Sequence, residues 1–139
     1  MSCCNKKEAV TTEKAKAIGP YSVGMKAGHF VFCSGQLGLD QATGEFVEGG
    51  VEAETRQALI NLSNILEAAG SSLDRVVKTT VFLRDMADFQ RMNAVYAEFF
   101  TDTPPARSTI QVGLPRNGAV EIEAVALMGE DDPDCNCGE

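Results

Sequence analysis

The sequence predicts an α+β domain with a single mixed β-sheet and two helices packed on one face of that sheet. Short extended runs, in which side chains alternate between two faces, are separated by turn residues along the whole chain. Two longer stretches repeat their apolar residues at helical spacing instead. The predicted order is three strands, a helix, a strand, a helix and two strands, which is an α+β arrangement.

Length and composition indicate one domain. The chain has 139 residues and is 44% hydrophobic, which is enough to bury a core. We expect a single domain over 1–139 with its core at about 9–128, and flexible ends at 1–8 and 130–139. Those ends hold four of the five cysteines in spacings typical of neither a disulfide framework nor a zinc site: Cys3, Cys4, Cys135 and Cys137.

Charge narrows the possible partners. The formal net charge is −8, and no basic cluster is longer than Lys6-Lys7, so a nucleic-acid groove is not expected. No apolar stretch reaches eighteen residues and the first ten residues, MSCCNKKEAV, lack the apolar core of a signal peptide. We therefore expect a cytoplasmic protein that contacts neither nucleic acid nor membrane.

The first third of the chain predicts an edge strand and a hairpin, at Ala9–Glu13, Ser22–Lys26 and His29–Ser34. The Gly19-Pro20 turn fixes the direction in which Tyr21 projects. Ser34 precedes Gly35, where the chain must turn. His29, the only histidine, is expected to be an exposed strand start, and Cys33 a small buried hydrophobe.

Two helices are predicted. The first runs over Val51–Ala69, is stopped by Gly70, and is expected to be purely structural, with Glu54 on its wet face. The strand Leu73–Leu83 follows, and Asp85 is the expected N-cap of the second helix, with Asp88 as a weak capping box. Asn93 interrupts the apolar stripe of that second helix, either as a core amide with its hydrogen bonds satisfied or as a side chain facing a polar site.

The last two strands, within Pro104–Met128, carry charged residues among apolar ones. Arg107 and Thr109 share one strand face, and Glu121 and Glu123 share a face of the next strand. Charges on such apolar strands are costly unless they are paired or used. A structural ion pair and a chemical site both remain open interpretations at this point.

The two helices can cover only one face of the sheet, yet the strands Val76–Leu83 and Val120–Leu127 carry apolar residues on both faces. A large exposed apolar sheet face is rare in a soluble monomer, so a partner subunit is expected to cover the second face. The pattern therefore predicts a homo-oligomer without giving the number of copies.

Several motifs together resemble the RidA/YjgF family over roughly residues 12 to 128. They occur in the order IGPYS (18–22), SGQ (34–36), TGE (43–45), NILEAAG (64–70), VVKTTVFLRDMADF (76–89), NAVYAEFF (93–100), PARS (105–108) and VEIEAVA (120–126). The resemblance implies a chorismate-mutase-like fold and a homotrimer whose other sheet faces form a central barrel-like core, with sites at the subunit interfaces. It also implies 2-iminobutanoate/2-iminopropanoate deaminase activity on a small 2-imino or 2-enamino acid, without a metal or organic cofactor.

The chain departs from the family pattern at three places. The segment QVGLP (111–115) is one residue shorter than usual, which bears on the strand end that places Glu121. Thr109 stands where some members carry cysteine, which argues against an essential thiol there. Lys16 stands where many members carry proline.

Imine hydrolysis assigns a role to each matching residue. Arg107 is the expected bidentate ligand of the substrate carboxylate. Glu121 is the expected general acid/base, provided that burial raises its pKa, while Glu123 is given a structural or interface role. The family positions expected to bind substrate are Tyr21, Ser34, Gly35, Asn93 and Thr109. The alternative function is a trimeric module that binds a small carboxylate, such as a keto acid, without turnover.

Overall fold

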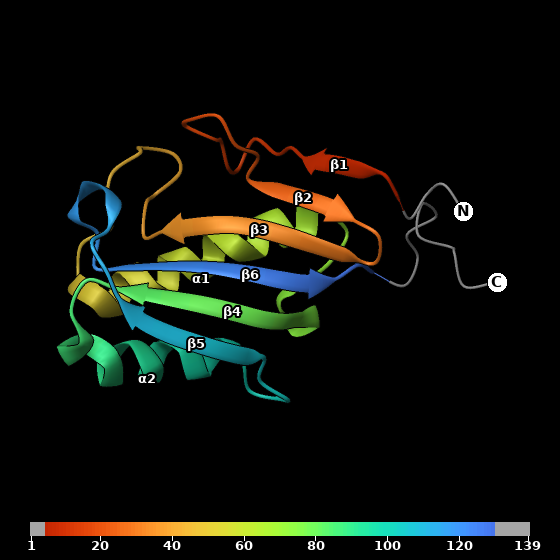
Figure 1. Cartoon of the computed structure of the whole chain (residues 1–139). Helices are drawn as coiled ribbons and strands as arrows, with labels where there is room; N and C mark the ends of the chain where they lie inside the picture. The colour runs from red at the N-terminus through yellow and green to blue at the C-terminus, as the bar shows by residue number, and fades with distance from the viewer. Residues whose placement is uncertain (1–4, 130–139) are drawn as a thin grey trace.

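The computed structural model describes residues 5–129 and shows one six-stranded sheet in the order β1-β2-β3-β6-β4-β5 (Figure 1). Only the β4–β5 pair is parallel, so the sheet is mixed, as predicted. The strands are β1 (Lys7–Val10), β2 (Gly24–Ala27), β3 (Phe30–Leu37), β4 (Val76–Leu83), β5 (Ala106–Gln111) and β6 (Val120–Leu127), and the helices are α1 (Gly50–Ala68) and α2 (Phe89–Phe99). Single 3₁₀ turns precede β4, α2 and β6, at Leu73–Arg75, Met86–Asp88 and Pro115–Asn117.

The predicted element order is confirmed, but the edge strand was placed too far along the chain. It lies at Lys7–Val10 rather than Ala9–Glu13, because Lys7 aligns with Ala27 and Val10 with Gly24 across the β1–β2 pair. The segment after Val10 leaves the sheet through a local Thr12–Ala15 bridge. Lys7 therefore belongs to a strand and not to a flexible end. Residues 1–4 and 130–139 of the predicted ends, including their four cysteines, lie outside the described residues.

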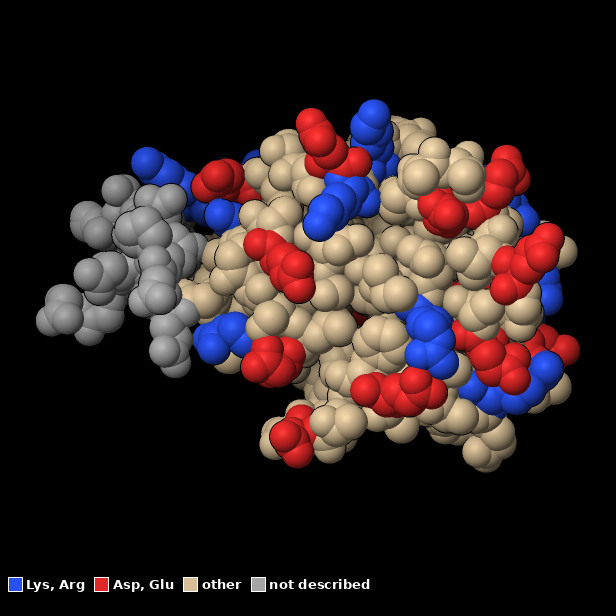
Figure 2. Space-filling view, turned by 180° about the vertical axis from the view of Figure 1, so that it is seen from behind, with Lys and Arg blue, Asp and Glu red and all other residues tan. Residues whose placement is uncertain are grey.

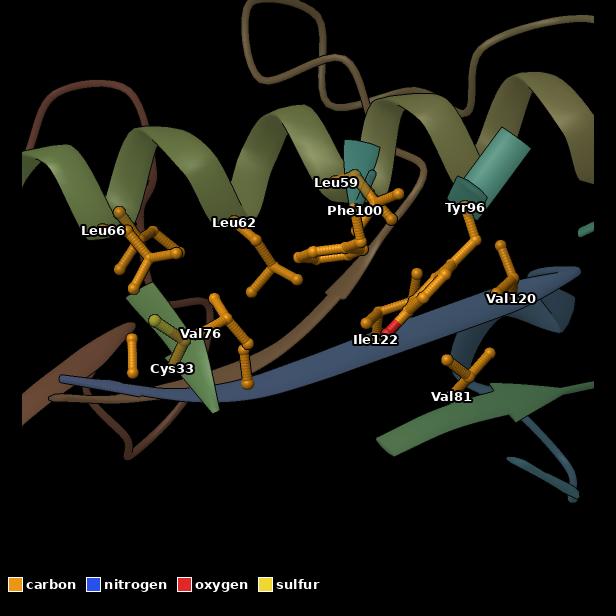
Figure 3. Close-up of a cluster of buried hydrophobic side chains, with 14 of the residues drawn as sticks. Cys33, Leu59, Leu62, Leu66, Val76, Val81, Tyr96, Phe100, Val120 and Ile122 are labelled. Carbon is orange, nitrogen blue, oxygen red and sulfur yellow. The ribbon is translucent and has the colours of Figure 1, made fainter. Parts of the chain in front are cut away.

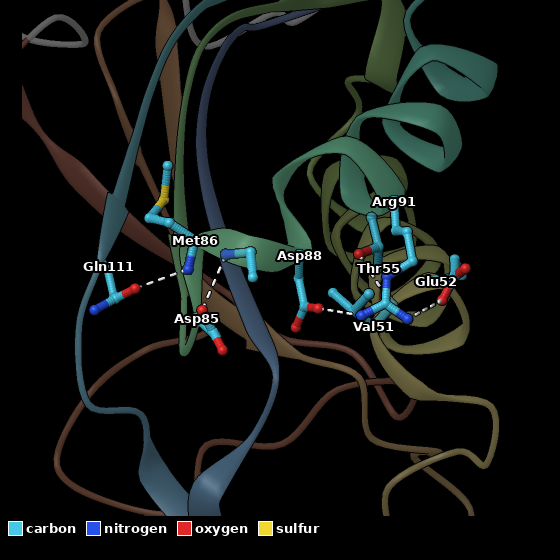
Figure 4. Close-up of polar contacts among 9 residues, drawn as sticks. Val51, Glu52, Thr55, Asp85, Met86, Asp88, Arg91 and Gln111 are labelled. Atoms are coloured by element: carbon cyan, nitrogen blue, oxygen red, sulfur yellow. Dashed lines mark hydrogen bonds and ion pairs between the residues drawn. The ribbon is translucent and has the colours of Figure 1, made fainter.

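The start of α2 also differs from the prediction. Asp85 does act as a cap, but it accepts the Ala87 backbone N–H at the 3₁₀ turn that precedes α2 (Figure 4). Asp88 makes no side-chain cap; its carboxylate instead pairs with Arg91, which also lies near Glu52 of α1. The expected Asp85–Asp88 capping box is therefore wrong, because the arginine one turn further along draws the Asp88 carboxylate to itself.

Both helices pack on one face of the sheet, as predicted, and the core fills the space between the helices and the sheet (Figures 1 and 3). The α1 side chains that recur at helical spacing are fully buried against β3 and β6, and each contributes roughly 1.5–3 kcal/mol of burial free energy. They include Leu59, Leu62, Ile65 and Leu66. Cys33 is buried with them and its burial raises the thiol pKa to about 12, so it is the small hydrophobe that the sequence predicts.

The opposite sheet face carries large apolar side chains that are uncovered in a single chain. Phe30 and Phe32 of β3, Ile110 of β5 and Leu127 of β6 each keep more than a third of their surface exposed. Their chain neighbours, such as Val31 and Ala126, are fully buried toward the helices. The two-sided apolar pattern of the strands is thus confirmed.

The outer surface behind the sheet is polar. On the side that Figure 2 shows, Lys and Arg side chains are interspersed with Asp and Glu and form no continuous basic surface. Arg56 of α1 pairs with Glu98 of α2 at 2.8 Å, an exposed contact between the two helices. Within residues 5–129, no helix is long and apolar enough to cross a membrane.

A glycine sets how closely α1 approaches the sheet. A Cβ at Gly38 would lie 2.5 Å from the backbone Cα of Glu54, so Gly38→Ala must push the helix away. We expect this overpacking to cost about 1–3 kcal/mol of unfolding free energy, measured by urea denaturation at a fixed protein concentration. The control is Gly113→Ala, because nothing lies within 4 Å of a Cβ at Gly113. Equal stability of the two variants would contradict this packing constraint.

Candidate active site

Arg107 lies on the helix-facing side of β5, under α2. Its Nη1 donates a hydrogen bond to Asn93 Oδ1 at 2.8 Å. Its guanidinium carbon lies 4.8 Å from the centre of the Tyr96 ring and 5.5 Å from that of Phe89, within the range of cation–π attraction. Asn93 therefore interrupts its apolar stripe because it holds an arginine.

The Tyr96 ring beside Arg107 is held in place by a hydrogen bond in the core. Tyr96 OH is hydrogen-bonded to Thr79 Oγ1 at 2.7 Å, deep in the core. Burial raises the pKa of Tyr96, against the opposing effects of the Thr79 hydrogen bond and the Arg107 charge, so the phenol stays neutral. Among residues 5–129, no carboxylate forms an ion pair with Arg107. Arg107 therefore does not form the structural ion pair that the sequence left open as an alternative, at least within the described residues of one copy of the chain.

Thr109 lies two residues beyond Arg107 on the same side of β5. Its Oγ1 is buried and has no hydrogen-bond partner among the described residues. A buried hydroxyl without a partner lowers the free energy of unfolding by about 1–3 kcal/mol. The Thr109 hydroxyl is therefore available for a hydrogen bond to a group that one copy of the chain lacks. Arg107, Asn93 and Thr109 are named the arginine cluster below.

Glu121 lies on β6, on the sheet face opposite the helices. Its neighbours Val120 and Ile122 are fully buried on the helix side, so alternation directs Glu121 the other way. A Cβ at Gly35 would lie 2.8 Å from the Glu121 carboxyl carbon. Gly35 falls in the irregular stretch of β3 between Cys33 and Gln36, where the register shifts. The glycine thus makes the space that the carboxyl group occupies.

The pKa of Glu121 is raised, chiefly by burial and further by the negative charge of Glu123. The condition set for Glu121 as an acid/base, a pKa raised by burial, is therefore met. A carboxyl group with a raised pKa holds a proton nearer to neutral pH than an ordinary glutamate does, which suits proton transfer. Glu123 is exposed on the same side of β6.

Ser34 precedes Gly35 along the chain, and its hydrogen bonds tie it to the segment that follows Tyr21. Ser34 Oγ donates to Ser22 O at 2.6 Å and Ser34 N–H donates to Val23 O at 2.9 Å. Tyr21, beside Ser22, is half exposed, and its OH accepts the Ile18 backbone N–H at 3.4 Å. Tyr21, Ser34, Gly35 and Glu121 are named the glutamate cluster below.

The fold does not bring the two clusters together within one copy. Arg107 aligns with Thr79 of β4, whose side chain is buried under α2, whereas Glu121 aligns with Phe82 on the β4–β6 pair. Strand β4 therefore separates β5 from β6, and the two charged groups project from opposite faces of the sheet. A ligand that contacts both needs a second copy of the chain.

Phe89 and Tyr96 also contact Arg107, although the sequence predicts them only as members of the apolar stripe of α2. The signal was present, since Phe89, Asn93 and Tyr96 recur at intervals of four and three residues and so share one face of α2. Within the described part of the chain, no three His, Cys, Asp or Glu side chains gather closely enough to hold a metal ion.

Comparison with known proteins identifies the family. The model of the family described as Endoribonuclease L-PSP matches residues 11–128. A RutC family protein of Pyrococcus horikoshii is 52% identical over 86% of this chain and 97% of its own length. The mouse 2-iminobutanoate/2-iminopropanoate deaminase is 48% identical over 93% of this chain and 96% of its own length.

A solved structure agrees with these sequence matches. The 1.2 Å crystal structure of the Escherichia coli YjgF gene product superimposes with a TM-score of 0.82, at 44% identity over 86% of this chain and 98% of that chain. The chain belongs to the RidA/YjgF family, and its α+β fold is the fold of that family.

The raised pKa of Glu121 predicts how stability depends on pH. Because the folded-state pKa lies above the unfolded value of about 4.3, the native state loses stability as pH rises from that value through the folded pKa. Glu121→Gln removes this loss, so we expect a higher Tm than wild type at pH 8 and a difference that disappears below about pH 4. Thermal unfolding across this pH range is the measurement, with Glu67→Gln on exposed α1 surface as the control. A lower Tm for Glu121→Gln at pH 8 would contradict it.

Proposed function

We propose that the protein is a 2-iminobutanoate/2-iminopropanoate deaminase, which hydrolyses reactive imine or enamine intermediates to 2-oxo acids and ammonia. The observation that carries the proposal is the Arg107 guanidinium, which is oriented by Asn93 and two rings yet has no carboxylate partner among residues 5–129. A planar fork held in this way suits a small carboxylate. The name of the mouse relative supports the choice of reaction.

Each step of the reaction has a group available to perform it. Arg107 binds the substrate carboxylate, and the Thr109 hydroxyl gains the hydrogen-bond partner that it lacks. Glu121 takes a proton from water as the water oxygen bonds to the imine carbon, and returns a proton to the nitrogen. The resulting carbinolamine gives its hydroxyl proton to Glu121, which passes it to the amine nitrogen as the C–N bond breaks, so that one imine and one water give one 2-oxo acid and one ammonia.

The same proposal requires a particular assembly. The arginine cluster and the glutamate cluster lie on opposite faces of one sheet, so each site combines the arginine cluster of one copy with the glutamate cluster of another. In a homotrimer, the exposed apolar face formed by Phe30, Phe32, Ile110 and Leu127 packs against the other copies as a central barrel-like core. Three sites per trimer follow.

The competing function is a module that binds a keto acid without turnover. It uses the same Arg107 but gives Glu121 no role, so the response to changes at Glu121 separates the two. The description of the matching family model also names an endoribonuclease activity. The net charge of −8 opposes RNA binding, and an RNA titration at low salt with no binding would dismiss it.

The function is tested most simply in a coupled assay. A threonine dehydratase releases the 2-imino acid, and formation of 2-oxobutanoate is followed with and without the purified protein. We expect the protein to accelerate 2-oxobutanoate formation in proportion to its concentration. An unchanged rate would reject the deaminase and favour the binding module.

Arg107 should matter to turnover more than to stability. Two charge-assisted hydrogen bonds at roughly 1.5–3 kcal/mol each make Arg107→Ala cost about 3–5 kcal/mol, or roughly two to four decades in kcat/KM. Arg107→Lys keeps the charge without the fork, so it recovers only part of this. Steady-state kinetics and Tm are measured on both variants, with Arg56→Ala as a control on the outer helix surface. A destabilised but active Arg107→Ala protein would refute the assignment.

The two-copy site makes a prediction about mixed assemblies. Arg107→Ala and Glu121→Gln should each be inactive alone, but trimers refolded from an equal mixture should regain activity at about one quarter of their interfaces, where both intact groups meet. The control mixes Arg107→Ala with the Arg107→Ala/Glu121→Gln double variant, which cannot rebuild any site. If the first mixture stays as inactive as its parts, each site lies within a single copy.

A further inference from the structure

Helix α1 presents three polar side chains, Glu54, Gln57 and Asn61, toward the end of the sheet that carries Glu121. Their spacing of three and four residues places them on one helix face. The sequence analysis placed Glu54 on a wet face of a purely structural helix. That placement is wrong, because Glu54 is only partly exposed and accepts a hydrogen bond from Ala119, the residue before β6.

Asn61 is a fully buried residue whose side-chain amide is hydrogen-bonded through both its nitrogen and its oxygen. Its Nδ2 donates to Leu37 O at 3.1 Å and to Leu39 O at 2.9 Å, and its Oδ1 accepts from Gln57 Nε2 at 2.9 Å. Buried amides persist where their hydrogen bonds fix a particular backbone path. Here the path is the end of β3 and the turn that follows it.

Glu54 fixes a second segment, the peptide that precedes β6. Its Oε1 accepts the Ala119 N–H at 2.9 Å, and the Ala119 carbonyl accepts the Arg84 N–H from the end of β4 at 3.0 Å. The Gly38 backbone packs directly on Glu54 Cα, which leaves the helix no room to shift toward the sheet. The peptide that precedes β6 is therefore fixed on both of its sides.

These two contacts enclose Glu121. Leu37 is the residue that aligns with Glu121 across the β3–β6 pair, and Ala119 lies two residues before Glu121, immediately before β6 begins. We propose that Glu54, acting with Asn61, is a positioning residue that fixes the Glu121 carboxyl group against Gly35. The inference rests on the proposed function in one respect, that Glu121 is the acid/base. Glu54 itself touches no reacting atom.

The effect follows from the geometry of proton transfer. Misplacing a catalytic group by about 1 Å can cost on the order of a hundredfold in rate, and a strand released at Ala119 has that freedom. Charged groups near this strand end include Glu123 on β6, Glu54 on α1 and the Arg84 side chain, whose Nη1 donates to Asn117 O. Arg116, in the turn before β6, pairs with Glu45 at 3.8 Å. Burial and Glu123 raise the pKa of Glu121, so a carboxyl group that moves into water should lose part of that shift.

The experiment compares two substitutions of one residue in the full chain. Glu54→Gln keeps an oxygen that can accept the Ala119 N–H, whereas Glu54→Ala removes it. We expect Glu54→Ala to lower kcat on the order of tenfold or more with KM nearly unchanged, because Arg107 still binds the carboxylate. Glu54→Gln should keep most of the rate. Glu67→Ala removes an exposed α1 carboxylate with the same change of charge and should match wild type.

A second measurement does not depend on turnover. The ¹³C resonance of the Glu121 carboxyl carbon, identified by its loss in Glu121→Gln, is titrated with pH in each variant. We expect the apparent pKa of Glu121 to fall toward the ordinary glutamate range in Glu54→Ala and to stay at the wild-type value in Glu54→Gln and Glu67→Ala. Asn61→Asp, which places an oxygen against the Leu37 and Leu39 carbonyls, should shift it in the same direction as Glu54→Ala.

The outcomes separate the two proposals. If wild type has no deaminase activity but the Glu121 titration moves only in Glu54→Ala and Asn61→Asp, the proposed function fails and the positioning role stands. If wild type is active and Glu54→Ala matches it in both kcat and titration, the positioning role is overturned while the function stands. A fall in kcat that is equal in Glu54→Gln and Glu54→Ala would assign the effect to charge and also overturn it.

Discussion

The alternation of side chains along a β-strand is the constraint on which this structure depends. It directs Arg107 toward α2 and Glu121 away from both helices, although both residues belong to the same sheet. No rotamer change can reverse this, because a one-residue slip would exchange the buried and exposed faces of the whole strand. The separation is a property of the fold, and it makes a site that uses both residues necessarily intermolecular.

Each helix supports a different part of the proposed site. Helix α2 holds Arg107 through Asn93 and the rings of Phe89 and Tyr96, and Tyr96 is anchored in turn by Thr79. Helix α1 holds the strand ends on either side of Glu121 through Glu54 and Asn61. The helix layer therefore fixes groups on both faces of the sheet, one by direct contact and the other through the backbone.

Much of the fold was predictable because the spacing of apolar residues, alternate in strands and every three or four residues in helices, can be recognised within a single segment of the sequence. The strands, both helices and the uncovered apolar face follow from such patterns, and so does the burial that raises the pKa of Glu121. What could not be predicted depends on contacts between distant segments. Nothing local to Glu54 indicates that it accepts the Ala119 N–H, and the Lys7–Val10 edge strand is set by its pairing with β2.

The candidate site was predictable in its residue types but not in its arrangement. Arg107 and Glu121 are conspicuous as charges on apolar strands, and Asn93 as an amide in an apolar stripe. Gly35 is expected from the sequence to bind substrate. The structure shows that its missing side chain leaves space for the Glu121 carboxyl group. This space depends on the irregularity of β3 between Cys33 and Gln36, which no local sequence pattern predicts.

The two-copy site can be observed in a crystal structure of the assembled protein with 2-oxobutanoate, the 2-oxo acid product of the proposed reaction. We expect the ligand carboxylate to be bound by Arg107 of one copy, and the carbonyl carbon to lie within one water of Glu121 from a second copy. A ligand held by the residues of one copy alone, or with Glu121 remote from its carbonyl carbon, would contradict it.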